Sequence, residues 1–267
     1  MNRVFYGVDG RSIDHLLGNG FVDNILISAI MLWRNGKFAL PNRLPKHDAL
    51  FLDSGGFTFT NRTGTYPFTP EQYAGIALEI VADYVAVMDY PCKPGEDNAT
   101  KIDQTIQNSI ACHAIKGVPW VQVVQGGDLT EYQTCCDLIK KWGLETPIMA
   151  VGSLKCRSKS SEVLAIIRAV SRNFPSVKIH AFGPNLRAIR NRYIRNILYQ
   201  SDTTVWRINS EGGNRFPKSM EEKLRNYDRY RVKMDKILKE DQLSTYLCGE
   251  DMISKRGVEQ VPALEPT

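Results

Sequence analysis

The sequence predicts a single α/β domain, a (β/α)8 barrel. Eight short apolar runs rich in Val, Ile and Phe recur along the chain, and amphipathic stretches of helical period separate most of them. The length of 267 residues is also usual for such a barrel. A doubly wound open sheet is the alternative, but the G-x-G-x-x-G pattern of dinucleotide-binding sheets is absent.

The eight apolar runs are the predicted strands. Val, Ile and Phe favour strands because their side chains pack well on a pleated surface. Helical stretches alternate with the runs, so the C-terminal ends of the strands are expected to meet at one end of the barrel, which we call the mouth. In chain order the predicted strands cover residues 4–8, 25–31, 50–53, 84–88, 120–124, 148–151, 177–181 and 203–206.

Capping residues mark the clearest helices between these strands. Thr69 is followed by Pro70, a typical N-cap with proline in the first turn. Asp128 and Ser160 are expected to begin two further helices, each with a glutamate close behind.

The chain after the last strand is predicted to form a separate element. Residues 217–240 favour one long charged helix outside the barrel, and residues 261–267 are typical of a loose tail. We therefore expect a barrel over residues 1–210. A C-terminal helical extension and loose tail, packed on the barrel, would follow over residues 211–267.

Positive charge is concentrated near the C-terminus. The formal net charge is +5, yet residues 187–236 alone carry an excess of seven basic over acidic residues. This segment has two interpretations of equal standing, a docking surface for a polyanion and a solvated helix face. The candidate nucleic-acid-binding residues are Arg187, Arg190, Arg207, Arg215, Lys218 and Arg225.

Other classes of protein are disfavoured by what the sequence lacks. No signal peptide is recognisable at the N-terminus and no apolar run approaches the ~18 residues of a membrane span, so we expect a cytoplasmic protein. The six cysteines include no C-x-x-C pair, and no histidines cluster near them. Neither a zinc site nor a disulfide framework is predicted, and no cofactor is expected.

Polar residues or glycines stand at the ends of the predicted strands. Because the mouth of a barrel carries its active groups, these residues are the candidates for chemistry. Carboxylates at Asp53, Asp89 and Asp202 belong to three different strands. The full set in chain order is Asp9-Gly10, Asp53-Ser54-Gly55-Gly56, Asp89, Gln125-Gly126-Gly127, Gly152-Ser153-Leu154, His180 or Gly183, and Ser201-Asp202.

Each of these residues also has a purely structural interpretation. Asp53 could cap a tight turn made by two glycines, Asp89 could cap the turn before Pro91, and Asp202 could be a helix N-cap. Their joint placement at strand ends favours chemistry instead. Paired carboxylates can divide nucleophilic and proton-transfer roles, as glycosyl transfer requires. Glycine turns beside Gln125 suit a flat, purine-like ligand.

An ordered set of five motifs resembles the tRNA-guanine transglycosylase superfamily. The resemblance covers residues 49–206, and the order of the motifs is far more specific than any one of them. The motifs are Asp53-Ser54-Gly55-Gly56-Phe57, Met88-Asp89, Val123-Val124-Gln125-Gly126-Gly127, Ala150-Val151-Gly152-Ser153-Leu154 and Ser201-Asp202-Thr203-Thr204-Val205-Trp206. The fold of that superfamily, a (β/α)8 barrel, agrees with the strand count.

The resemblance implies a role for each matching position. Asp202 would be the nucleophile that attacks C1′ of a guanosine and forms a covalent glycosyl-enzyme, and Asp53 would be the general acid/base. Phe57 would lie near the face of the base. The implied base-binding residues are Ser54, Gly55, Gly56, Phe57, Asp89, Gln125, Gly126, Gly152, Ser153 and Leu154. No chemical role is implied for His180.

One departure separates the chain from the tRNA enzymes. Their C-terminal zinc site of clustered cysteines and a histidine is missing, since only Cys248 lies beyond Cys156 and no histidine follows His180. The resemblance is therefore strongest to the short DNA 7-deazaguanine transglycosylases of phages and bacteria (DpdA type). It implies exchange of guanine for a 7-deazaguanine, such as preQ0, in DNA, without a cofactor.

Three alternatives remain open at this point. The substrate could be tRNA, and a non-catalytic barrel could bind nucleic acid or support a partner subunit. A small-molecule hydrolase of purine glycosides could use the same carboxylates, although it would need no basic surface. A homodimer or a partner protein is also compatible with the sequence.

Overall fold

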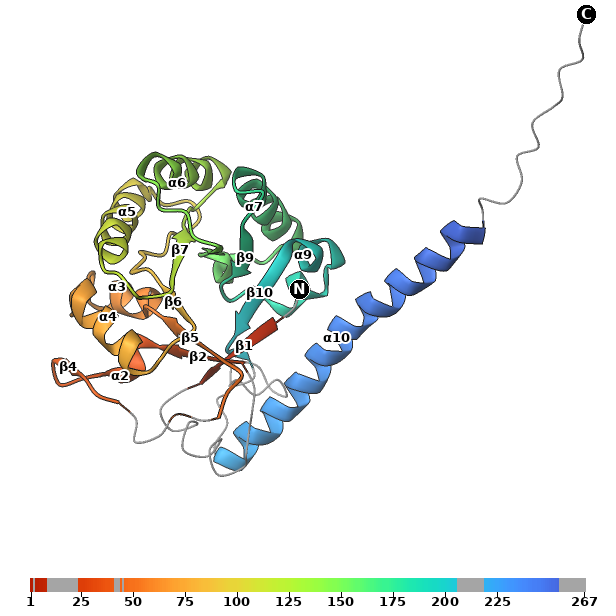
Figure 1. Ribbon diagram of the computed structural model, residues 1–267, viewed down its shortest axis with the longest axis horizontal. Helices are drawn as coiled ribbons and strands as arrows, with labels where there is room; N and C mark the ends of the chain where they lie inside the picture. Colours follow the sequence, from red (N-terminus) through yellow and green to blue (C-terminus); the bar gives the residue numbers. More distant parts are fainter. Residues whose placement is uncertain (2, 9–23, 41–43, 45, 206–218, 255–267) are drawn as a thin grey trace, which may run out of the picture.

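A computed structural model describes residues 1, 3–8, 24–40, 44, 46–205 and 219–254. Eight parallel strands close into a barrel in the order β1-β10-β9-β8-β7-β6-β5-β2, and helices surround it (Figure 1). The predicted (β/α)8 barrel is confirmed. The strands are β1 (Arg3–Val8), β2 (Asn24–Ser28), β5 (Ala49–Asp53), β6 (Tyr84–Ala86), β7 (Trp120–Val124), β8 (Ile148–Val151), β9 (Lys178–Ala181) and β10 (Leu198–Thr203).

Three predicted strands were wrong in their extent. The strand predicted over 84–88 ends at Ala86. The last strand is β10, Leu198–Thr203, rather than residues 203–206. It escaped notice because Gln200 and Asp202 face the barrel interior, so no uninterrupted apolar run marks it. The strand predicted over 25–31 ends at Ser28, where the short helix α2 (Ala29–Leu32) begins. Asp202 therefore lies inside the last strand, near its C-terminal end.

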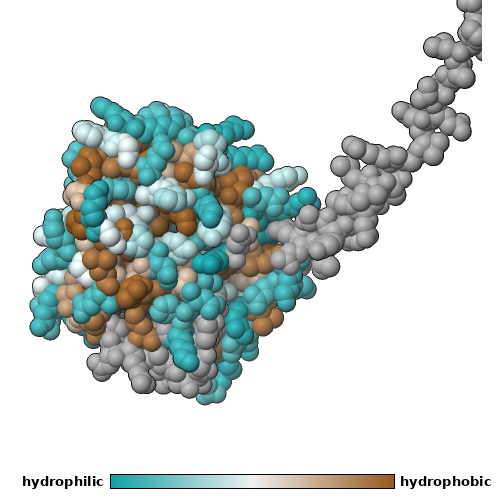
Figure 2. Space-filling model, in the orientation of Figure 1, coloured by the Kyte–Doolittle hydropathy of each residue, from teal (hydrophilic) through white to brown (hydrophobic). Residues whose placement is uncertain are grey.

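The helices lie outside the strands (Figure 1), and many hydrophilic side chains lie along the outer edge of the visible face (Figure 2). A small hairpin of β3 (Trp33–Arg34) and β4 (Lys37–Phe38) follows α2. The described helices after this hairpin are α3 (Gly56–Thr63), α4 (Pro70–Glu79), α5 (Ala99–Ala114), α6 (Leu129–Trp142), the 3₁₀ turn η1 (Leu154–Cys156), α7 (Ser160–Asn173), α8 (Leu186–Arg190), α9 (Arg192–Ile197) and α10 (Met220–Ser254).

Two of the three predicted caps are confirmed. The Thr69 side chain accepts from the Gln72 N–H and the Gln72 side chain accepts from the Thr69 N–H, a reciprocal capping box that begins α4. The Asp128 side chain accepts from the Glu131 N–H at the start of α6. The cap predicted at Ser160 is wrong, because α7 already includes that residue and its N-cap is Lys159, without a side-chain bond.

Helix α10 begins close to the predicted position and runs on to Ser254. Its first half packs beside β1 and β10. The Tyr227 ring meets Tyr6 edge-on at 5.0 Å, and the Tyr230 hydroxyl lies 3.3 Å from Thr203 Oγ1. The expected boundary near residue 210 lies outside the described residues, so the division into barrel and extension stays a prediction. No helix in the described ranges combines the length and apolarity that crossing a bilayer requires.

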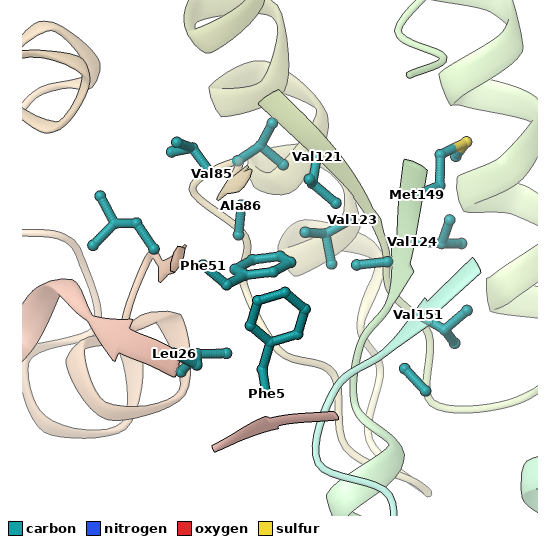
Figure 3. Close-up of a cluster of buried hydrophobic side chains, with 14 of the residues drawn as sticks. Phe5, Leu26, Phe51, Val85, Ala86, Val121, Val123, Val124, Met149 and Val151 are labelled. Atoms are coloured by element: carbon teal, nitrogen blue, oxygen red, sulfur yellow. The ribbon is translucent and has the colours of Figure 1, made fainter. Parts of the chain in front are cut away.

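An aromatic plug fills the barrel below the mouth. Phe5 and Phe51 meet edge-on with ring centroids 5.5 Å apart, and Leu26 and Val123 lie around them (Figure 3). Strand register then fixes the direction of the acids. Phe5 is the partner of Asp202, so both face the interior. Asp53 lies two residues beyond Phe51 and shares its face. Both carboxylates therefore lie directly above the plug.

Candidate active site at the barrel mouth

A cavity of about 570 Å³ opens at the mouth. Three carboxylates from three strand ends line it, those of Asp53, Asp89 and Asp202. Apolar side chains that include Leu26 and Phe182 form another part of the wall. The volume is in the range of small-molecule sites, and a few convergent polar groups on an apolar wall are typical of such sites.

The environment of the Asp53 carboxyl makes its protonated and ionised forms similarly populated near neutral pH. Burial, together with the negative charges of Asp89 and Asp202, raises the pKa of Asp53 to about 7, although bonds from the Ser28 side chain and the Gly55 N–H oppose the rise. The Gly55 N–H donates to Asp53 Oδ2 at 3.1 Å. A carboxyl that is half protonated near neutral pH can both give and take a proton.

Asp89 is buried, and two side-chain donors bind its carboxylate. Ser54 Oγ donates to Oδ1 at 2.9 Å, and Gln125 Nε2 donates to Oδ2 at 2.5 Å. Burial raises the pKa of Asp89, and these two donors partly offset that rise. The Tyr66 hydroxyl donates to the backbone carbonyl of Asp89 at 2.7 Å, which fixes the loop after β6. This carboxylate is therefore rigid and suited to binding rather than attack.

A chain of hydrogen bonds orients the Gln125 amide. The Cys92 N–H donates to Ser153 Oγ at 2.9 Å, and Ser153 Oγ donates to Gln125 Oε1 at 2.6 Å. The amide nitrogen is thereby directed at Asp89. Gly152 makes room for this arrangement, because a Cβ there would lie 2.2 Å from Gln125 Nε2. The Gly152 N–H donates to Val124 and its carbonyl accepts from Tyr132, so side chains dominate the polar lining here.

Asp202 differs from the other two acids in its contacts. It is 8 % exposed, and the Gly183 N–H donates to its Oδ1 at 2.8 Å. His180 Nε2 lies 3.5 Å from the same oxygen. No partner is recorded for Oδ2 among the described residues. Oδ1 is thus fixed, and the Asp202 side chain lines the cavity.

The predicted base-binding residues fall into two groups. Half of them line the cavity: Phe57, Asp89, Gln125, Gly152 and Ser153. The others support the wall from behind: Ser54, Gly55, Gly56, Gly126 and Leu154. Gly56 illustrates this second role, since a Cβ there would lie 2.4 Å from the Asp89 carbonyl oxygen. Gly55 and Gly56, both predicted to bind the base, are not in the cavity lining, and Gly56 allows the loop that carries Asp89 to approach closely.

Three of the six predicted nucleic-acid-binding residues are described, and none of these three lines the cavity. Arg187 and Arg190 are exposed on α8, and Arg225 pairs with Glu221 at 2.6 Å on α10. These three are absent from the cavity lining. Arg207, Arg215 and Lys218 lie outside the described residues.

Several functional candidates escaped the sequence analysis. Arg62, Lys93 and Lys155 line the cavity and are exposed, and the Lys155 ammonium lies 4.8 Å from the centroid of the Phe57 ring. We call these three cations the basic rim. Lys155 directly follows the Gly152-Ser153-Leu154 motif and Lys93 lies four residues after Asp89, but a lone lysine in a loop is too common to be a signal.

Arg157, which the sequence did not mark as a candidate, also supports the site. It is buried, and its Nη2 donates to the carbonyls of Gly126 and Gly127 at 3.1 and 2.8 Å. Its Nη1 bonds Glu162 at 2.5 Å. This clamp fixes the turn that follows Gln125. Within the described part of the chain, no three Cys, His, Asp or Glu side chains are grouped as a metal site would require.

Comparison with known proteins agrees with this geometry at the level of the family. A search of curated proteins finds no match. A family model matches residues 31–241, which is most of the chain and includes all three carboxylates of the cavity. The chain therefore belongs to the family described as DpdA, DeoxyPurine in DNA protein A.

Proposed function

We propose that this chain exchanges guanine in DNA for a 7-deazaguanine base of the preQ0 kind through a covalent glycosyl-aspartate. Membership of the DpdA family supports a transglycosylase that modifies DNA. The observation that carries the proposed covalent mechanism is the contrast between two acids in one cavity. Asp53 has a pKa of about 7, whereas Asp202 lines the same cavity with its Oδ1 fixed by the Gly183 N–H. Environments that differ in this way assign an acid/base and a nucleophile.

The first half of the reaction would remove guanine. Asp202 attacks C1′ of the target nucleotide, so a C1′–O bond forms as the C1′–N9 bond breaks. Protonated Asp53 gives its proton to the departing base, which leaves as neutral guanine. Aspartate at position 53 is then ionised and Asp202 is an ester.

The second half would reverse these roles with a different base. N9 of the incoming 7-deazaguanine attacks C1′, and the Asp53 carboxylate takes the proton from that nitrogen. The C1′–O bond breaks and Asp202 regains its negative charge. Atoms and protons balance over the two steps without an oxidant, reductant or further co-reactant.

Base recognition would use the rigid groups beside these acids. The Watson–Crick edge of guanine presents N–H donors, which suit the fixed Asp89 carboxylate, and an acceptor, which suits an amide N–H. Gln125 is held within reach of the same space by Ser153. Phe57 is 46 % exposed and lines the cavity, so its ring is available to the face of the base. A target base must leave its stack to enter.

Charge is layered across the mouth in a way that suits a nucleotide. The three carboxylates are wholly or largely buried, whereas the basic rim of Arg62, Lys93 and Lys155 is exposed. Only Lys93 has a recorded acidic partner among described residues, Glu96 at 3.6 Å. A base in the cavity would place its flanking phosphates near these cations. We therefore propose that the basic rim, rather than the C-terminal arginines, contacts the DNA backbone next to the target.

Alanine substitutions would separate these two surfaces. Arg62→Ala and Lys155→Ala are each expected to reduce the slope of log affinity against log salt by about one, since each removes one phosphate contact. Fluorescence anisotropy with a DNA duplex at several salt concentrations measures the slope. Lys141→Ala, at the far end of α6, is the matched control and should leave it unchanged. If Arg187→Ala or Arg190→Ala reduced the slope and the rim variants did not, the phosphate contacts would be assigned to α8 instead of the basic rim.

Base exchange itself is tested with labelled preQ0, duplex DNA and tRNA in parallel reactions. We expect label in DNA and a 7-deazaguanine nucleoside in its digest by mass spectrometry. Label in tRNA alone would make the chain a tRNA enzyme. Release of free base from nucleosides without preQ0 would favour a purine glycoside hydrolase. DNA binding with no exchange on either polymer would leave a non-catalytic barrel.

A further inference from the structure

His180 is the most unusual polar residue beneath the cavity. It lies on β9, is fully buried and faces the barrel interior beside Gln200 of β10. Its ring packs against Phe182 at 4.6 Å, Phe51 at 4.7 Å and Phe5 at 6.2 Å between centroids. Neither ring nitrogen has a hydrogen-bond partner within the described residues. A buried polar group without a partner is costly, so its presence calls for a function.

The Nε2 atom of His180 is directed at the Asp202 carboxylate. Nε2 lies 3.5 Å from Asp202 Oδ1, just beyond a formed hydrogen bond, and this is the oxygen that already accepts from the Gly183 N–H. Apolar rings occupy much of the remaining surroundings of the imidazole. At this distance, Asp202 Oδ1 can accept a proton carried on Nε2.

We propose that His180 is a positioning residue for Asp202, an inference that rests on the proposed nucleophilic role of Asp202. Its neutral tautomer with hydrogen on Nε2 donates to Oδ1 of Asp202. Together with the Gly183 N–H it fixes the carboxylate plane, so that Oδ2 is the oxygen that attacks C1′. Gln200 is the strand partner of His180, and neither atom of its amide group has a hydrogen-bond partner among the described residues. The Gln200 amide can therefore bind Nδ1 of His180, directly or through a buried water.

The same two donors serve both halves of the exchange. When Oδ2 bonds to C1′, Oδ1 becomes the carbonyl oxygen of an ester and still accepts from Gly183 and His180. When the ester breaks, negative charge returns to the carboxylate, and donors already aimed at Oδ1 stabilise it without rearrangement. His180 would thus act through Asp202 and never touch the nucleotide.

Two substitutions separate positioning from packing. His180→Phe keeps an aromatic ring among aromatic neighbours and removes the donor, whereas His180→Gln keeps an N–H near the position of Nε2. We expect His180→Phe to slow formation of the DNA adduct about 10- to 100-fold, with DNA affinity and melting temperature preserved. His180→Gln should recover most of the rate. His113→Gln, on α5 outside the barrel, is the matched control and should react like the unmodified protein.

Quantitative single-turnover trapping of the adduct on denaturing gels measures these rates. An unchanged rate in His180→Phe would overturn the proposal. Equal losses in His180→Phe and His180→Gln, accompanied by a lower melting temperature in both, would also overturn it, because they indicate a packing role.

A measurement on the resting protein distinguishes this proposal from the function on which it rests. Nitrogen-15 NMR of the imidazole should show the Nε2–H tautomer, and Asp202→Ala should shift the Nε2 resonance. An Nδ1–H tautomer, or a resonance unmoved by Asp202→Ala, would refute the contact even in an active enzyme. If the expected signals appear but no adduct ever forms, the contact stands and the proposed exchange reaction is wrong.

Discussion

Replacing Asp202 by asparagine is expected to abolish the covalent DNA adduct and to lower the rate of base exchange by at least about 10⁴-fold. An amide has no negative oxygen with which to attack C1′. The change is nearly isosteric, and the amide oxygen can still accept from the Gly183 N–H, so the fold should persist. Affinity for DNA should also persist, because the proposed phosphate contacts are made by the basic rim and not by Asp202.

The adduct is measured by denaturing electrophoresis of the protein with a labelled oligonucleotide, and exchange by incorporation of labelled preQ0. Asp103→Asn is the matched control, since Asp103 is exposed on α5 and far in sequence from the strand-end motifs. A persisting adduct in Asp202→Asn would show that another group attacks. Asp53 would then be the first candidate, and its asparagine variant would lose the adduct instead.

How much the sequence could predict follows from which forces act locally. Strands and helices follow apolar periodicity and caps, so the barrel and the order of its strand-end motifs were predictable. Strand β10 was misplaced because its inward positions carry Gln200 and Asp202 instead of apolar residues. A polar interior is what a site requires, so the apolar rule fails at the strand that carries the candidate nucleophile.

Contacts between distant loops were beyond the sequence. The bonds that join Ser54, Asp89, Gln125 and Ser153 link residues 28 to 36 positions apart, and they depend on side-chain orientations that no spacing encodes. The contact between His180 and Asp202 arises from the register of β9 on β10. The basic rim is likewise assembled from three separate segments, with Arg62 on α3, Lys93 in the loop after β6 and Lys155 on η1, whereas the charge count pointed to the C-terminal segment.

Asp53→Asn is expected to lower the rate of exchange by about 10²- to 10⁴-fold, the usual contribution of a general acid/base. The asparagine can neither protonate the departing guanine nor accept the proton of the incoming base. Asp202 is untouched, so slow adduct formation should remain detectable. Complete retention of the exchange rate in this variant would remove Asp53 from the mechanism.

The pH dependence of the unmodified protein provides a second readout of the same role. Adduct formation needs protonated Asp53, so its rate should fall about tenfold per pH unit above the pKa of about 7. Release of the adduct to the incoming base needs the ionised form and should slow below that pH. Asp89→Asn removes a neighbouring negative charge that raises the pKa of Asp53, so it should move both limbs to lower pH. Limbs that stay in place would assign the titration to another group.

The substitution Asp53→Asn should raise the stability of the fold at high pH while it lowers the rate of exchange. The pKa of Asp53 is raised in the fold from 3.8 to about 7, so the folded state binds the proton more tightly than the unfolded chain. The contribution of this group to stability is therefore complete below pH 4 and is lost as pH rises through 7. Asp53→Asn removes the cost of burying the charge. It should raise the free energy of unfolding at pH 8.5 by about 2–4 kcal/mol.

The difference in unfolding free energy between Asp53→Asn and the unmodified protein should shrink toward zero near pH 4. Urea unfolding at pH 8.5 and pH 4.5 measures it, with Asp103→Asn again as the control that should show no such pH dependence. A gain in stability that is equal at both pH values would mean that the asparagine simply packs better. A gain confined to high pH, together with lost exchange, would mean that the fold keeps a destabilising carboxyl where the reaction needs a proton.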